Sequence, residues 1–313
     1  IGFRRIDILL DHPQKVYYSG HQISGNVHLE LDEPTNALAL TQTIRGKLSP
    51  PWISEKVVSR RAFKDSDRPT RVEAFESYLH VETYVVGGVD GKEKSVITGG
   101  VYPFSLTLPE KLPCSFEGRY GRVRYSIRAL LDVTTIYRFS TNIIPFTVAP
   151  ILDLNRDPLA PLPINIKQSK MYIGQTEPLT VSMSLPVRGY VPGQAIPITI
   201  LMTNLSTVVV TKIRIVFKKV VSYHSTEKSR KHKEIIVEVE QPVNKDSDTY
   251  DVTFDVPAVP PTGMIHCNII DVLYTLKIFS QLIINHKNLK LRTNIVVGTV
   301  PLQNYETPQK TTD

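Results

Sequence analysis

The sequence predicts an all-β protein built from two tandem immunoglobulin-like β-sandwich domains. Three observations lead to this prediction: short runs in which apolar and polar residues alternate, 23 prolines spread through 313 residues, and a long internal repeat. Alternation with period two is typical of strands that bury one face, and frequent proline prevents long helices. Strand-length runs separated by turn residues favour a sandwich in each half of the chain.

The repeat consists of two pairs of similar segments. YYSGHQISGNVHLEL aligns with GYVPGQAIPITILMTN, which places Gly20 on Gly193. Further on, YPFSLTLPEKLPCSFEGRYGRVRYSIRALL aligns with YDVTFDVPAVPPTGMIHCNIIDVLYTLKIF, and after a slip of one residue Tyr125 falls on Tyr274. The period is far longer than the roughly 20 to 50 residues of solenoid repeats, so it indicates two similar domains in tandem.

Domain boundaries follow from the repeat and from the proline content. We predict an N-terminal sandwich over residues 1–150, a proline-rich linker over 151–163, a C-terminal sandwich over 164–302 and the start of a polar tail over 303–313. Domains of about 150 residues bury enough surface to fold without disulfides or metals. The prolines of the linker favour a short, stiff and extended connector.

The clearest strand is predicted at residues 122–131, where Val123 and Tyr125 belong to an apolar face and arginines occupy the other face. Similar alternation predicts strands at 211–219 and 234–240. Prolines and glycines are expected to punctuate the strands rather than to lie within them. This expectation covers, among others, Pro103, Pro145 and Pro197.

Cysteine usage and hydropathy predict an intracellular, soluble protein. The two cysteines, Cys114 and Cys267, are expected to be unpaired thiols in a reducing compartment, with a disulfide or a reactive thiol as the alternative. No run approaches the ~18 apolar residues of a membrane span, and the first residues do not form a signal peptide.

Motifs of enzymes and of ligand-binding loops are missing from the sequence. It contains no G-x-S-x-G, no H-E-x-x-H, no phosphate-binding G-x-x-x-x-G-K and no paired cysteine ligands. We therefore predict no catalytic residue, no metal site and no cofactor. Nucleic acid is not predicted as a partner, because the basic runs lack the interleaved aromatic residues that stack on single strands.

A net charge of +7 with local basic clusters indicates acidic or phosphorylated partners, or an anionic membrane. The first cluster comprises Arg122, Arg124 and Arg128, which share the polar face of one predicted strand. Guanidinium groups match phosphate and carboxylate oxygens bidentately, so these three are candidates for binding an acidic or phosphorylated segment. The alternative is a solvated face with cross-strand partners among Glu73, Glu76 and Glu82.

The second cluster lies in HSTEKSRKHKE, between two strand-like runs. As the tip of a hairpin it would bring basic side chains to lipid headgroups, and the alternative is a solvated loop. These membrane-contact candidates are Lys228, Arg230, Lys231 and Lys233. A third basic run, from Lys56 to Arg71, is expected to form a loop between strands.

Several segments together resemble one known family. YSGHQISGNVHLEL, the stretch from Leu112 to Leu131 and GYVPGQAIPITILMTNLS resemble the arrestin fold, and specifically the arrestin-domain-containing proteins called α-arrestins. The most specific part is Ser115-Phe116-Glu117-Gly118 followed by Gly121 and Arg124-Tyr125. The resemblance implies a non-enzymatic cytosolic adaptor that binds the cytoplasmic tails of membrane proteins such as receptors and transporters. Recruitment to the plasma membrane and endosomes follows from the same resemblance.

The sequence departs from this family in one respect. Members usually carry Pro-Pro-x-Tyr motifs that bind HECT-type ubiquitin ligases, but both Pro-Pro pairs here continue differently, as Pro-Pro-Trp-Ile and Pro-Pro-Thr-Gly. Ligase recruitment and endocytic sorting are therefore expected only through a tail not present in this chain. An arrestin-like subunit of a retromer-type sorting coat is the alternative function.

Overall fold

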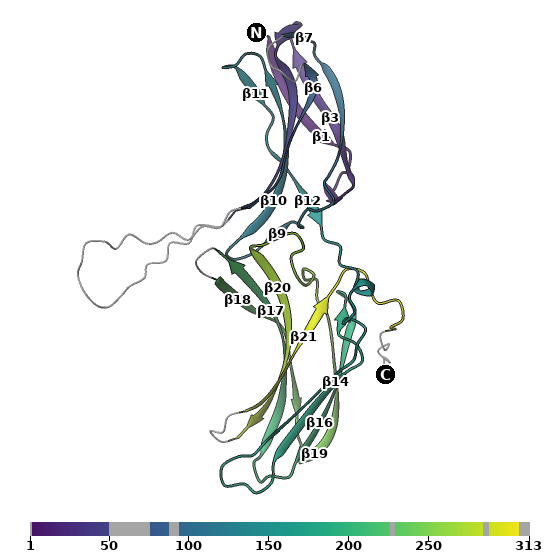
Figure 1. Ribbon diagram of the computed structural model, residues 1–313, viewed down its shortest axis with the longest axis vertical. Helices are drawn as coiled ribbons and strands as arrows, with labels where there is room; N and C mark the ends of the chain where they lie inside the picture. Colours follow the sequence, from purple (N-terminus) through teal and green to yellow (C-terminus); the bar gives the residue numbers. More distant parts are fainter. Residues whose placement is uncertain (1, 50–75, 88–93, 226–228, 284–287, 307–313) are drawn as a thin grey trace, which may run out of the picture. The chain divides into compact units, whose positions relative to one another are not determined.

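The computed structural model describes residues 2–49, 76–87, 94–225, 229–283 and 288–306 (Figure 1). The chain divides into two compact units. The first contains residues 1–150 with 223–229 and 265–269, and the second contains 151–222, 230–264 and 270–313. Both units consist of β-sheets, which confirms the predicted all-β fold of two tandem sandwiches.

The first unit has a smaller and a larger sheet (Figure 1). The smaller sheet has the order β1 (Phe3–Leu10), β3 (Gln22–Leu31), β8 (Gly100–Thr107). The larger has the order β2 (Val16–Tyr18), β12 (Ile144–Ala149), β10 (Arg122–Asp132), β5 (Ala39–Ser49), β6 (Glu76–Gly87). Short strands β9 (Phe116–Glu117) and β11 (Arg138–Ser140) also pair with β10, and β4 (Thr35–Ala37) pairs with β7 (Ser95–Ile97).

The second unit repeats this arrangement. One sheet has the order β13 (Ile164–Lys170), β14 (Leu179–Leu185), β16 (Ala195–Asn204), β19 (Ser247–Asp255). The other has the order β15 (Gly189–Tyr190), β21 (Leu289–Val297), β20 (Ile270–Leu282), β17 (Val210–His224), β18 (Ser229–Pro242). In each unit a short strand joins the larger sheet in parallel, β2 beside β12 and β15 beside β21, whereas the neighbouring pair β10–β12 or β20–β21 is antiparallel.

The internal repeat extends to individual hydrogen bonds. Gly20 and Gly193 both adopt positive φ, at 79° and 89°, where a side chain would be strained. The hydroxyl of Tyr125 donates to the carbonyl of Pro113 at 2.6 Å, and that of Tyr274 donates to Pro260 at 2.5 Å. The two aligned tyrosines therefore make similar hydrogen bonds, each to the carbonyl of a proline upstream, as expected for two copies of one fold.

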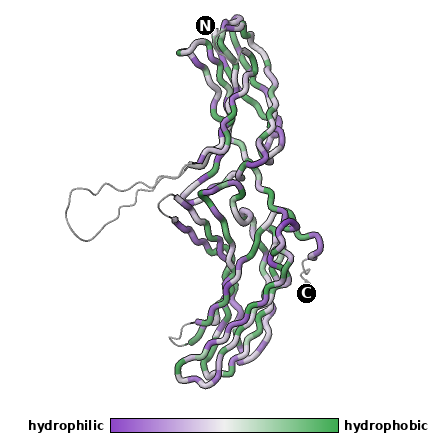
Figure 2. Tube along the Cα trace, viewed as in Figure 1, coloured by the Kyte–Doolittle hydropathy of each residue, from purple (hydrophilic) through white to green (hydrophobic). Residues whose placement is uncertain are grey.

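Apolar side chains at alternating positions of the strands form the core of each unit. Figure 2 shows the corresponding alternation of hydropathy along the strands. In β10, Val123, Tyr125 and Ile127 are buried, as predicted. In β17, Ile213 and Phe217 are buried in the same way. Burial of such large apolar side chains contributes roughly 1.5–3 kcal/mol each to folding.

Three prolines expected between strands lie within them. Pro103 is in β8, an edge strand, where one side of the backbone needs no partner. Pro145 is in β12 but precedes the residues that pair with β2, and Pro197 is in β16 but precedes those that pair with β14. Each proline thus occupies a position that is paired on one side only, so its missing N–H leaves no ladder incomplete.

The predicted hairpin tip at the second basic cluster is also wrong. β18 begins at Ser229 and runs to Pro242, so Arg230, Lys231 and Lys233 lie within the strand. Pairing with β17 extends the strand beyond the predicted range 234–240, because an edge strand exposed to solvent accommodates charged side chains. Lys228 lies outside the described residues, as do Glu73 and the third basic run from Lys56 to Arg71.

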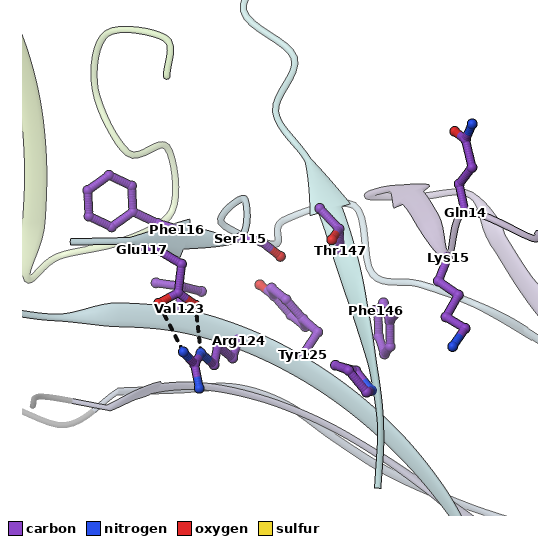
Figure 3. Close-up of a pocket in the computed structure, with 11 residues that line it drawn as sticks. Gln14, Lys15, Ser115, Phe116, Glu117, Val123, Arg124, Tyr125, Phe146 and Thr147 are labelled. Carbon is purple, nitrogen blue, oxygen red and sulfur yellow. Dashed lines mark hydrogen bonds and ion pairs between the residues drawn. The ribbon is translucent and has the colours of Figure 1, made fainter. Parts of the chain in front are cut away.

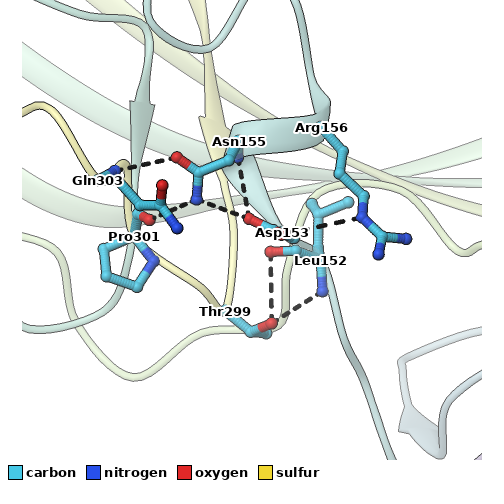
Figure 4. A network of polar contacts seen from close by, with 7 residues as sticks. All are labelled: Leu152, Asp153, Asn155, Arg156, Thr299, Pro301 and Gln303. Atoms are coloured by element: carbon cyan, nitrogen blue, oxygen red, sulfur yellow. Dashed lines mark hydrogen bonds and ion pairs between the residues drawn. The ribbon is translucent and has the colours of Figure 1, made fainter.

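The proline-rich segment 151–163 is attached to the second unit. It contains a short 3-10 helix, η1 (Leu154–Arg156), and Leu154 is fully buried against Gly189 and Gly298. Figure 4 shows the polar contacts that surround η1. Asn155 donates through Nδ2 to Asp153 at 2.8 Å and to the Pro301 carbonyl at 2.9 Å. This segment is therefore held by specific contacts rather than by stiffness alone.

Candidate functional site

The three arginines of the first cluster lie on one face of β10. Arg124 is exposed and Arg122 and Arg128 are half-buried, whereas Val123 and Tyr125 point into the core. Successive residues of a strand point to opposite faces, so the arginines follow one another along the solvent side of the larger sheet. The sequence pattern placed them on a common face correctly.

The structure adds a fourth arginine to this surface. Arg45 of β5 is exposed and lies directly opposite Ser126 in the β5–β10 ladder, between the positions of Arg124 and Arg128. Side chains directly opposite each other in an antiparallel pair share a face. Sequence reasoning missed Arg45 because its proximity depends on the strand register. We call Arg45, Arg122, Arg124 and Arg128 the arginine face.

One member of the arginine face forms a bidentate ion pair. Arg124 donates from Nε to Oε1 of Glu117 at 2.6 Å and from a terminal nitrogen to Oε2 at 3.1 Å. These hydrogen bonds raise the pKa of Arg124. Glu117 was not among the acidic partners considered from the sequence, because the short strand β9 brings it beside β10. The described part of the chain gives Arg45, Arg122 and Arg128 no ion pair.

A pocket of about 620 Å³ opens beside Arg124 (Figure 3). It forms because the same edge of β10 pairs with β9 at Arg122–Val123 and with β12 at Tyr125–Ile127, which leaves Arg124 between the two short ladders. Its lining combines aromatic rings with charged ends. The residues are Gln14, Lys15, Ser115, Phe116, Glu117, Val123, Arg124, Tyr125, Pro145, Phe146 and Thr147.

The pocket has a rigid floor and a second cation. Tyr125 is buried, its hydroxyl is fixed on Pro113, and its ring lies 5.7 Å from that of Phe146. Lys15 has a φ of 54°, which is uncommon for a residue with a side chain, and its carbonyl accepts from Thr147 N–H at 2.9 Å. In Figure 3, Lys15 lies across Phe146 and Thr147 from Arg124. The pocket thus offers an apolar floor between two cationic side chains.

A second basic surface lies on the larger sheet of the second unit. Lys277 of β20 is directly opposite Arg292 of β21, and the pKa of Lys277 is lowered by burial and by the charges of Lys218, Arg292, Lys233 and Lys290. Like charges directly opposite each other in a sheet are destabilising, so an anionic ligand would relieve a repulsion that the fold carries. We call Lys218, Lys233, Lys277, Lys290 and Arg292 the cationic face.

The cationic face contains one membrane-contact candidate that was predicted from the sequence, together with residues that were not. Lys233 belongs to it, and Lys231 is exposed on the same strand, while Arg230 is half-buried. The aromatic ring of Phe279 lies within the face, with Lys290 Nζ 5.5 Å and Arg214 Cζ 5.9 Å from its centroid. The hydrocarbon stems of such cations cover apolar surface while the charged ends stay in water.

The described residues contain no group of three His, Cys, Asp or Glu side chains placed to hold a metal ion. In the same ranges, no helix is long and apolar enough to cross a membrane. Cys114 and Cys267 do not form a disulfide. Burial raises the pKa of Cys114 to about 11, so this thiol is protonated at neutral pH and is a poor nucleophile.

Two similar β-sandwiches in tandem agree with the arrestin fold that the sequence resembles. The family models described as "Arrestin (or S-antigen), N-terminal domain" and "Arrestin (or S-antigen), C-terminal domain" match residues 6–155 and 175–302. The chain belongs to the arrestin-domain-containing proteins, the α-arrestin family, as its sequence motifs predicted.

Curated relatives agree with this assignment. Arrestin domain-containing protein 17 of Caenorhabditis elegans is 28% identical over 316 residues, covering 95% of this chain and 71% of the relative. Human arrestin domain-containing protein 4 is 27% identical over 304 residues, covering 94% and 71%. Mouse arrestin domain-containing protein 1 is 27% identical over 195 residues, covering 61% and 41%. Arrestin-family proteins are generally non-enzymatic adaptors, and the family assignment supports an adaptor role in general for this chain.

Proposed function

We propose that this chain is a cytoplasmic adaptor that binds the cytoplasmic tails of membrane proteins through the arginine face and the adjoining pocket. The observation that carries the proposal is the gathering of Arg45, Arg122 and Arg128, to which the described residues give no ion pair, beside a pocket with an apolar floor. A tail with phosphorylated or acidic residues would pair with the arginines, and a neighbouring apolar side chain would enter the pocket.

The pair between Arg124 and Glu117 supports a competitive mode of binding. Both side chains are largely exposed, with 58% and 63% of their surface accessible. A phosphate carries more charge than a carboxylate, so it would displace Glu117 from Arg124 when the tail binds. Acidic side chains without phosphate would compete less well, which gives the surface a preference for phosphorylated tails.

We further propose that the cationic face contacts anionic lipid while the tail is bound. Each basic side chain near an anionic surface contributes about 1 kcal/mol to membrane association. Lys277, Lys290 and Arg292 supply such side chains on one sheet surface, together with the membrane-contact candidates Arg230, Lys231 and Lys233 of β18. This contact would recruit the adaptor to the plasma membrane and endosomes.

Links to HECT-type ubiquitin ligases and to endocytic or endosomal sorting belong to the same proposal. No Pro-Pro-x-Tyr motif occurs in the 313 residues, so no residue of this chain is proposed to recruit a ligase. The working domains are a sandwich over 1–150 and a sandwich over 164–302, joined by the segment 151–163. Tail binding is assigned to the first sandwich and lipid contact to the second.

The test is fluorescence anisotropy with labelled tail peptides of receptors and transporters, each phosphorylated and unmodified, over a range of salt concentrations. The triple variant Arg122→Ala/Arg124→Ala/Arg128→Ala is compared with Arg156→Ala, which removes an exposed arginine of η1. We expect phosphate-dependent binding that weakens with salt and is lost in the triple variant alone. Equal binding by all three proteins would reject the arginine face, and binding to no tail would favour the sorting-coat subunit.

Lipid contact is tested separately with vesicles of phosphatidylcholine, with and without phosphatidylserine. The variant Lys277→Ala/Lys290→Ala should lose sedimentation with phosphatidylserine vesicles, and the arginine triple variant should keep it. If both variants sediment like the unaltered chain, the cationic face does not contact lipid.

A further inference from the structure

β18 is a long strand that has a neighbouring strand on one side only among the described residues. It spans 14 residues, and at the margin of its sheet β17 is its neighbour (Figure 1). Natural edge strands usually carry charges that prevent pairing with another chain. Such protection works when the charges repel an incoming copy, so the order of the charges along the strand decides whether β18 is protected or adhesive.

The charges of β18 are separated by sign. The basic residues occupy its first half and the acidic residues follow. The basic ones are Arg230, Lys231 and Lys233, with His232 between them, and the acidic ones are Glu234, Glu238 and Glu240. An antiparallel second copy of the same strand therefore brings the basic half of each chain onto the acidic half of the other.

One register fits both charge and burial. It places Lys231 opposite Glu240 and Lys233 opposite Glu238, and all four side chains are exposed. In the same register the half-buried His232 falls opposite the half-buried Val239. Matching burial is required because opposite side chains of an antiparallel ladder share a face.

The central residues explain how lysines at odd positions and glutamates at even positions reach one face. Burial alternates regularly from Ser229 to Lys233 and again from Val237 to Pro242, but the three residues 234–236 interrupt the alternation. The exposed positions are odd-numbered before this interruption and even-numbered after it, which is the change of face that one extra residue in a strand produces. We infer from this that Lys231 and Lys233 share a face with Glu238 and Glu240.

The glutamates retain their own partners in such a pair. Lys212 Nζ donates to Glu240 at 2.7 Å, and Arg214 donates to Glu238. A carboxylate has about four lone-pair sites, so each glutamate has capacity for a lysine of a second copy. The edge strand at the equivalent position of the first unit, β6, lacks this pattern, because no Lys or Arg occurs in ESYLHVETYVVG.

We propose that two copies of this chain associate through antiparallel pairing of their β18 strands, forming a two-fold symmetric dimer with a continuous sheet. The interface is self-complementary, as two-fold symmetry requires, because each lysine–glutamate pair occurs twice. Dimerisation goes beyond the proposed adaptor function and does not depend on it. A dimer would present two arginine faces to clustered tails and so gain avidity.

The test is sedimentation velocity of the chain from low micromolar to several hundred micromolar, with two charge-reversal variants. Lys231→Glu/Lys233→Glu makes the strand acidic, and Glu238→Lys/Glu240→Lys makes it basic. We expect a concentration-dependent dimer for the unaltered chain. For each variant alone, the affinity of dimerisation should fall on the order of 100-fold or more. A mixture of the two variants again sets a lysine opposite a glutamate in all four pairs, two of them with reversed sign, so it should form a heterodimer.

A monomer at every concentration would overturn the proposal, as would a Lys231→Glu/Lys233→Glu variant that dimerises like the unaltered chain. Glu238 and Glu240 also bind Arg214 and Lys212 within the chain, so Glu238→Lys/Glu240→Lys can disturb folding. Lys231→Glu/Lys233→Glu leaves these pairs intact and therefore tests the proposal by itself. Circular dichroism verifies the fold of each variant. Oligomer mass is measured without lipid or peptide, so this result is independent of the tests of tail and vesicle binding.

Discussion

Removal of the Tyr125 hydroxyl tests the most specific contact of the repeated fold. The Tyr125→Phe change keeps the buried ring and deletes the donor to the Pro113 carbonyl at 2.6 Å. Leaving a buried acceptor without a partner costs about 1–3 kcal/mol, and no cavity term is added because the ring stays. For a unit of this size each kcal/mol lowers the melting temperature by about 2–4 °C, so a decrease of roughly 2–12 °C is expected.

Differential scanning calorimetry measures this decrease, and the second unit supplies a matched variant. Tyr274→Phe removes the equivalent donor to Pro260 and should cost a similar amount. Gln42→Leu serves as a control that should raise the melting temperature instead. Gln42 is fully buried, and its amide atoms have no hydrogen-bond partner among the described residues. The substitution should stabilise the first unit by about 1 kcal/mol or more. Unchanged melting in both tyrosine variants would refute the reasoning.

Two further predictions concern the segment 151–163 and the thiols. Leu154→Ala should lower the free energy of unfolding by about 2–4 kcal/mol, because Leu154 fills the space between Gly189 and Gly298. Urea titrations measure this cost. A cost below about 0.5 kcal/mol would mean that η1 is not anchored. In a Cys267→Ser background, alkylation of native Cys114 should be slow at pH 7. Its rate should rise about tenfold per pH unit towards the raised pKa of the thiol, which is about 11. Rapid labelling at pH 7, measured by mass spectrometry, would contradict this.

Local patterns in the sequence predicted the strands and the repeat because alternation and turn residues act over a few positions. The inward Val123 and the outward Arg124 follow from period two alone. Pro145 and Pro197 were misplaced because their tolerance depends on which neighbouring strand pairs with which residue. Likewise, β18 includes Arg230 because it pairs with β17. This pairing cannot be predicted from the local sequence pattern.

The candidate sites show the same division. The three arginines of β10 were accessible to sequence reasoning, whereas Arg45 and Glu117 reach them only through the registers of β5 and β9. Lys277 and Arg292 lie on two consecutive strands and become direct neighbours in the β20–β21 ladder. A search for basic residues that alternate with apolar residues would have found both. That they lie opposite each other follows only from the pairing of β20 with β21.

The most direct test of the account is photo-crosslinking of a phosphorylated tail peptide that carries a benzophenone next to its phosphate. Mass spectrometry then identifies the residues of this chain that form adducts. If tails bind at the arginine face, adducts form in the pocket lining, at Phe146 and around Arg124, and are lost when unlabelled phosphorylated peptide competes. Adducts confined to another surface, or labelling that is indifferent to the phosphate, would contradict the assignment of tail binding to the arginine face.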